Sequence, residues 1–127
     1  WGADTGMLAA LHVLAMLGRS DQPLSELARD FDRYAASGEI NRQVADQQAC
    51  LAAVADAFSG RGEVEWGDGV LVTSPPDSPL GDWWVNVRPS NTEPLLRVNV
   101  EARQADVMAA LRDDALAIID HTNGGDR

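Results

Sequence analysis

The side chains of this sequence that could do chemistry are concentrated in residues 88–97, which read Arg-Pro-Ser-Asn-Thr-Glu-Pro-Leu-Leu-Arg. Ser90, Asn91 and Thr92 offer two hydroxyls and an amide, and an arginine stands at each end of the segment. The planar guanidinium group pairs with phosphate oxygens two at a time. Asparagine also tolerates the left-handed backbone that turns main-chain N–H groups toward an anion. The segment therefore predicts a binding site for a small dianion such as phosphate.

Two predicted strands must position this loop, because polar and apolar residues alternate on both sides of it. If Arg88 lies opposite Leu95 in a hairpin, Asn86 lies opposite Arg97. The two arginines are then diagonal neighbours, about 7–8 Å apart at the backbone, and leave the same face of the hairpin with their guanidinium groups converging. The apolar residues leave the opposite face, toward the helices: Trp83, Val85, Val87, Leu96, Val98 and Val100.

The other elements follow from apolar periodicity and turn residues. Helices are expected at residues 4–17, 23–35 (ended by Gly38), 47–59 and 104–120, and strands at 39–44, 63–66, 70–73, 83–88 and 95–101. Strands joined by short turns are usually antiparallel. This order predicts an α+β fold of two layers, in which a mainly antiparallel sheet of four to five strands is covered on one face by two helices and preceded by a helical hairpin.

The first predicted helix is apolar around most of its circumference, over which these side chains are spread: Met7, Leu8, Leu11, Val13, Leu14, Met16 and Leu17. Such a helix needs burial on several sides, and the rest of a 127-residue chain offers little to cover it. The chain also begins at Trp1 rather than at a methionine. We therefore expect it to be a piece of a longer protein, with a domain boundary at residues 36–39.

The composition narrows the function classes. The net charge is −10 and all ten basic residues are arginine, which argues against nucleic acid or an anionic membrane surface as a partner. No apolar run approaches the roughly 20 residues of a membrane span. Cys50 is the single cysteine, so an internal disulfide is excluded and a buried thiol in a cytoplasmic protein is expected.

Few residues outside the loop invite a functional interpretation. His12 and His121 have no matching partner, and we expect no metal site in this chain. Trp83 alternates with the core face and is expected to be buried. Trp84 falls on the arginine face and is expected to be exposed. The tryptophans could offer a platform for a sugar, although packing is the favoured interpretation.

Residues 88–97 resemble the phosphate-binding loop of the α-D-phosphohexomutases, which comprise phosphomannomutases, phosphoglucomutases and phosphoglucosamine mutases. The resemblance extends to Asp68-Gly69 before a strand, Trp83-Trp84 before the loop and residues 98–102 after it. Residues 39–127 would be the C-terminal, phosphate-binding domain, of the type that resembles TATA-binding protein. Residues 1–38 would be the terminal helices of the preceding, third domain, which binds the sugar.

The resemblance implies a four-domain enzyme that interconverts hexose 6-phosphate and hexose 1-phosphate through a phosphoserine and a sugar bisphosphate. Mg²⁺ would be held by an aspartate-rich loop outside this chain, and the partners would be the hexose phosphate and the upstream domains of the same polypeptide. The fourth domain would grip the phosphate that is not transferred and close the cleft. Carried onto this sequence, the phosphate contacts are Arg88, Ser90, Asn91, Thr92 and Arg97, and Glu93 braces the loop.

The family's phosphoserine, metal and sugar motifs are missing from this sequence, so we expect no catalytic residue here and no activity from the chain alone. By the same resemblance, the Ser-Asn-Thr version of the loop, rather than Ser-Gly-Thr, favours a phosphomannomutase or a dual mannose/glucose enzyme. Two alternatives stay open. One is a stand-alone phosphate-binding or anion-binding module without catalysis, and the other is a structural interaction domain that uses the apolar helix at residues 7–17.

Overall fold

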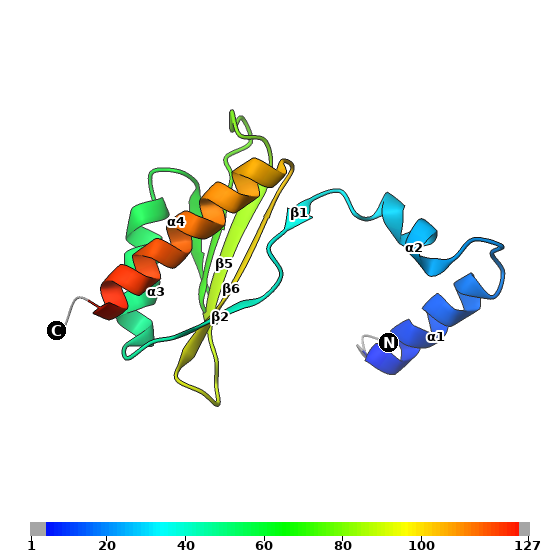
Figure 1. The fold of residues 1–127 in the computed structure, drawn as a ribbon, viewed down its shortest axis with the longest axis horizontal. Helices are drawn as coiled ribbons and strands as arrows, with labels where there is room; N and C mark the ends of the chain where they lie inside the picture. Colours follow the sequence, from blue (N-terminus) through cyan, green and yellow to red (C-terminus); the bar gives the residue numbers. More distant parts are fainter. Residues whose placement is uncertain (1–4, 125–127) are drawn as a thin grey trace. The chain divides into compact units, whose positions relative to one another are not determined.

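The structure is a computed structural model that describes residues 5–124. The chain divides into two compact units, Trp1–Arg33 and Tyr34–Arg127. The division falls between Arg33 and Tyr34, slightly before the boundary expected at residues 36–39. The second unit contains the whole sheet, the loop at residues 88–97 and the two long helices that follow the first unit (Figure 1).

The first unit begins with α1 (Gly6–Leu17), as predicted. The side chain of Thr5 caps this helix by accepting a hydrogen bond from the backbone N–H of Leu8 at 3.2 Å, and Gly18 ends it. The apolar side chains of α1 are exposed in this chain; Met7 is 77% exposed and Leu14 is 62% exposed. Large apolar side chains around a whole helix indicate a surface that another part of a protein covers.

The second helix is shorter than predicted. Pro23 begins it, but α2 (Leu24–Leu27) gives way to a 3₁₀ turn, η1 (Ala28–Asp30). The expectation that helix continues to Ala35 is wrong, because Ala35–Ala36 form strand β1. The backbone groups there pair with a neighbouring strand: Ala35 lies opposite Ala102, and the N–H of Ser37 donates to the carbonyl of Val100 at 2.9 Å. Tertiary pairing thus overrides the helical pattern of the segment.

The second unit is built on an antiparallel sheet of six strands. Its strands are β1, β2 (Ile40–Gln43), β3 (Glu63–Trp66), β4 (Val70–Thr73), β5 (Trp83–Pro89) and β6 (Leu95–Ala102). The order is β1-β6-β5-β4-β3, and β2 also pairs with β6. Strands β1 and β2 follow one another along β6, joined through Gly38, whose φ of 68° few other residues adopt. The sheet has one strand more than the four to five expected, because β1 was taken as helix.

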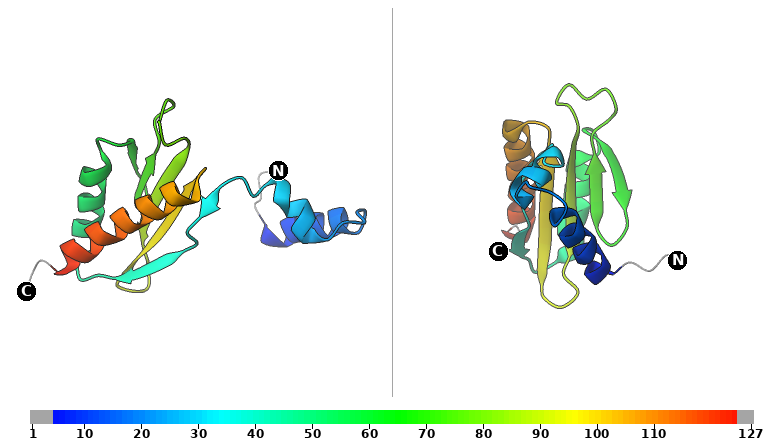
Figure 2. Two further views of the ribbon diagram at one scale, coloured as in Figure 1. Left: turned by 45° about the horizontal axis from the view of Figure 1, so that its top comes forward. Right: turned by 90° about the vertical axis from the view of Figure 1, so that its right-hand side faces the viewer.

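Two helices cover one face of the sheet, α3 (Gln47–Phe58) and α4 (Ala105–Gly124) (Figures 1 and 2). Asp46 caps α3 by accepting from the N–H of Ala49 at 3.0 Å. The core lies between this helical layer and the inward side chains of the strands, among them Phe58, Val85, Leu96, Leu111 and Ile119. The two-layer α+β fold is confirmed. The opposite face of the sheet carries no helix of this unit, and we call it the open face.

None of the helices within residues 5–124 combines the length and the apolar character that crossing a bilayer requires.

Candidate functional site

The β5–β6 hairpin places both arginines on the open face, but in a different register from the one assumed. Arg88 lies directly opposite Arg97, and Pro89 lies opposite Leu96. The assumed pairing of Arg88 with Leu95 is therefore wrong by two residues, because the turn closes inside residues 90–94 and Ser90 N–H donates to the carbonyl of Leu95 at 2.9 Å. Both arginines still lie on one face, as predicted, since a shift of two residues keeps every side chain on its face.

Direct opposition of two cations destabilises a strand pair unless an anion lies nearby. Glu39, which precedes β2, supplies one. Its carboxylate lies 3.5 Å from Arg88 Nη2 and 3.7 Å from Arg97 Nη1. These contacts are long, and the three side chains are 35–43% exposed, so the carboxylate offsets the repulsion without neutralising both arginines. The pair keeps positive charge for a further anion.

The loop forms a hollow against the same two arginines. Its volume is about 220 Å³, and its lining comprises Asp68, Arg88, Pro89, Ser90, Asn91, Thr92 and Arg97. Ser90 is 8% exposed, and its Oγ lies 3.5 Å from both the Oγ1 and the backbone N of Thr92. The Nε–H of Arg97 is buried and has no hydrogen-bond partner among residues 5–124. All five residues predicted to contact phosphate line this one hollow.

Helix α3 fixes the loop from the core side. The side-chain amide of Gln47 donates to three loop carbonyls, those of Leu95 at 2.9 Å, Glu93 at 3.3 Å and Ser90 at 3.5 Å. Glu93 contributes its backbone carbonyl to this network and also accepts from the N–H of Leu95 at 2.8 Å. Its side chain is exposed. Gln47, which sequence reasoning missed, thus holds the loop together with the backbone of Glu93, and bracing by the Glu93 side chain stays a prediction.

The turn between β3 and β4 brings a second missed residue to the site. The N–H of Gly67 donates to the carbonyl of Gly69 at 3.0 Å. Gly69 lies so close to β5 that a Cβ there would stand 2.7 Å from the Cα of Arg88. Asp68, at the tip of this turn, therefore lines the hollow beside Arg88. An aspartate in an Asp-Gly turn signals a turn, and only the fold reveals that the turn meets the loop.

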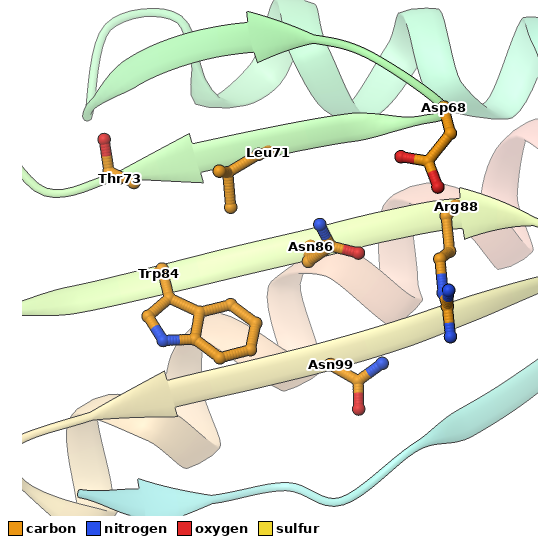
Figure 3. A pocket seen from close by; sticks show the side chains of 7 residues that line it. All are labelled: Asp68, Leu71, Thr73, Trp84, Asn86, Arg88 and Asn99. Atoms are coloured by element: carbon orange, nitrogen blue, oxygen red, sulfur yellow. The ribbon is translucent and has the colours of Figure 1, made fainter. Parts of the chain in front are cut away.

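A larger hollow adjoins the first on the open face. Its volume is about 470 Å³, and Figure 3 shows its lining side chains: Asp68, Leu71, Thr73, Trp84, Asn86, Arg88 and Asn99. Trp84, Asn86 and Arg88 follow one another along β5, and Asn99 reaches the hollow from β6. Trp84 is half-buried on this face, whereas Trp83 is 3% exposed in the core, as expected. Asp68 and Arg88 belong to both hollows.

The chemistry of these hollows is that of anion and polar-group binding. Within residues 5–124, no group of three or more His, Cys, Asp or Glu side chains could hold a metal ion. Cys50 is 1% exposed in α3 and lies away from both hollows. Burial raises the pKa of its thiol, and the charges of Asp46 and Asp120 raise it further. A thiol with a raised pKa stays protonated and is a poor nucleophile.

A family model for phosphoglucomutases and phosphomannomutases matches this chain, and so do individual phosphomannomutases. Residues 39–118, more than half of the chain, match the family model "Phosphoglucomutase/phosphomannomutase, C-terminal domain". The chain is 35% identical over 105 residues to a phosphomannomutase of Methanocaldococcus jannaschii, covering 83% of this chain and 22% of that protein. It is 38% identical over 102 residues to a phosphomannomutase of Escherichia coli, covering 79% of this chain and 21% of that protein.

A solved structure has the same fold. It is a phosphoglucomutase/phosphomannomutase family protein from Burkholderia thailandensis, with a TM-score of 0.67 and 24% identity. The alignment covers 98% of this chain and 25% of that one. The chain thus spans about a fifth to a quarter of the length of the proteins that it matches.

Gln47→Ala tests whether helix α3 holds the loop. We expect a loss of about 1 kcal/mol in the free energy of unfolding, because three carbonyls lose their shared donor. We also expect faster amide hydrogen exchange at Ser90 and Thr92 by NMR. Gln48→Ala is the matched control, since Gln48 is exposed on the same helix. Equal effects of the two substitutions on loop exchange would show that Gln47 does not hold the loop.

Proposed function

The chain belongs to the phosphoglucomutase/phosphomannomutase family and carries its C-terminal domain, and on this premise we propose that the loop grips the phosphate of a hexose phosphate. The proposal rests on one observation above all: Arg88 and Arg97 lie directly opposite one another on the open face, beside the hollow of the loop. Two guanidinium groups and two hydroxyls suit the oxygens of a phosphate dianion.

The residues of the hollow contribute different chemical groups to phosphate binding. Arg88 and Arg97 supply charge and paired N–H donors, and Ser90 and Thr92, which also line the hollow, supply hydroxyl donors. Asn91 lies at the exposed tip and can offer its side-chain amide. Each hydrogen bond to a charged group is worth roughly 1.5–3 kcal/mol before the cost of dehydrating the phosphate is subtracted. Asp68 and Glu39 limit this attraction, since both carboxylates lie near Arg88.

In the complete enzyme, this grip would act on the phosphate that is not transferred while a hexose 6-phosphate and a hexose 1-phosphate interconvert. Binding energy from a non-reacting group can hold the substrate in position for transfer. Movement of the domain over the cleft would exclude water from the reacting phosphate. The transfer itself belongs to a phosphoserine in other parts of the polypeptide, and this chain alone would be inactive.

The substrate we favour is a mannose phosphate, with glucose phosphate as the alternative. The Methanocaldococcus and Escherichia relatives are both named phosphomannomutase, and the loop carries asparagine at position 91. Mg²⁺ would assist the transfer, but residues 5–124 offer no ligand cluster for it, so its ligands would lie in other domains. We place the complete enzyme in the cytoplasm, with the upstream domains of the same polypeptide as partners of this one.

Arg88→Ala in the complete enzyme is expected to lower kcat/KM for the hexose phosphate. The expected loss of transition-state stabilisation is about 2–4 kcal/mol, because one charged, paired contact to phosphate is lost. Steady-state kinetics measure this directly. Arg42→Ala is the matched control, since Arg42 lies on strand β2 and pairs at 3.3 Å with Asp120 of α4, which covers the face of the sheet opposite the arginine pair. An unchanged kcat/KM in Arg88→Ala would refute the proposed grip.

Glu39→Gln probes the charge balance of the arginine pair. Removing this carboxylate leaves two opposed cations with less compensation, so we expect phosphate to bind more tightly by about 1 kcal/mol or less, given solvent screening. NMR titration of the 127-residue chain with inorganic phosphate gives the dissociation constant. Weaker binding in Glu39→Gln would mean that the carboxylate serves to orient the arginines, contrary to the role given to it here.

A further inference from the structure

The proposed phosphate grip assigns only Arg88 among the residues that line the larger hollow on the open face. Its volume of about 470 Å³ falls within the range of roughly 300–1,000 Å³ that small-molecule sites occupy. It is continuous in its lining with the phosphate hollow, because Asp68 and Arg88 belong to both. A phosphate ester held by Arg88 therefore has room for its organic part on the open face of β4, β5 and β6.

Trp84 gives this hollow an aromatic surface. Its neighbour Trp83 packs in the core, edge-on to Phe58 with ring centroids 6.5 Å apart. Trp84 lies on the opposite face and takes no part in that core. Figure 3 shows its indole ring lying over β5 and β6, with one face toward the open side of the sheet. A ring in this position offers a flat apolar surface to the C–H groups of a ligand while water is displaced from both.

Asn86 and Asn99 give the hollow its hydrogen-bonding groups. They are direct partners across β5 and β6, and along the sheet both side chains lie between Trp84 and Arg88 (Figure 3). Each amide offers two N–H donors and a carbonyl acceptor. The side-chain hydrogen bonds around this hollow are formed by other residues: Arg88 donates to Glu39, and Ser74 accepts from the backbone N–H of Trp83. Thr73 and Asp68 add a hydroxyl and a carboxylate at the rim.

An aromatic surface, two amides and an arginine on one face of the sheet are suited to a ligand with an apolar ring face, several hydroxyls and a terminal anion. We propose that this hollow holds the pyranose ring of the sugar phosphate, with its ring against Trp84 and its hydroxyls on Asn86 and Asn99. The inference rests on the proposed function, because the phosphate between Arg88 and Arg97 anchors the ring. It adds a sugar contact within this chain.

The test compares three ligands on the 127-residue chain by NMR titration: inorganic phosphate, glycerol 3-phosphate and mannose 6-phosphate. The last two are both phosphate monoesters, and only mannose 6-phosphate has a ring. We expect mannose 6-phosphate to bind about five-fold more tightly than glycerol 3-phosphate, as one aromatic contact would provide, and to shift the indole N–H signal of Trp84. Trp84→Ala should abolish this preference, and Trp84→Phe should keep most of it.

The controls separate this inference from the proposed function. If inorganic phosphate binds but mannose 6-phosphate shows no preference over glycerol 3-phosphate, the sugar contact is refuted and the phosphate grip stands. A preference that persists in Trp84→Ala refutes the contact equally. If inorganic phosphate does not bind, both proposals fail together. Asn99→Ala serves as a second variant, in which we expect about a two-fold to five-fold loss of the same preference from one lost hydrogen bond.

Discussion

The direct opposition of Arg88 and Arg97 across β5 and β6 is the constraint on which the rest of the site depends. Two cations at facing positions of a sheet repel one another, and the contacts with Glu39, at 3.5 and 3.7 Å, compensate only in part. The arrangement is stable because the side chains on the other face of the same two strands are buried: Val85, Val87, Val98 and Val100 are at most 1% exposed. The core fixes the register, and the register brings the charges together.

The period of two residues along a strand separates stability from binding in this unit. Inward side chains of β4, β5 and β6 pack against α3 and α4, and outward side chains of the same strands line the two hollows. The loop then needs one link to the scaffold, and Gln47 of α3 provides it through three carbonyls. Substitutions on the open face can therefore change ligand binding with little effect on the core.

Much of this arrangement could be predicted from the sequence, because alternation assigns strand faces and the Arg-Pro-Ser-Asn-Thr segment is chemically distinctive. The register could not, since a hairpin loop that includes Pro94 can close in more than one way. Ala35 in strand β1 was taken as helix because it fits the helical spacing that starts at Leu24, and pairing with β6 decides its structure. Glu39, Gln47 and Asp68 reach the site only through the fold.

The central claim is that the arginine pair binds phosphate, and thermal unfolding of the 127-residue chain tests it most directly. The melting temperature would be compared in phosphate and in sodium chloride of equal ionic strength, for the unchanged chain and for Arg88→Ala/Arg97→Ala. Phosphate at ten times its dissociation constant should add about 1.4 kcal/mol of stability to the unchanged chain. We predict a rise in melting temperature that is absent from the double variant. An equal rise in both proteins, or none in either, would contradict it.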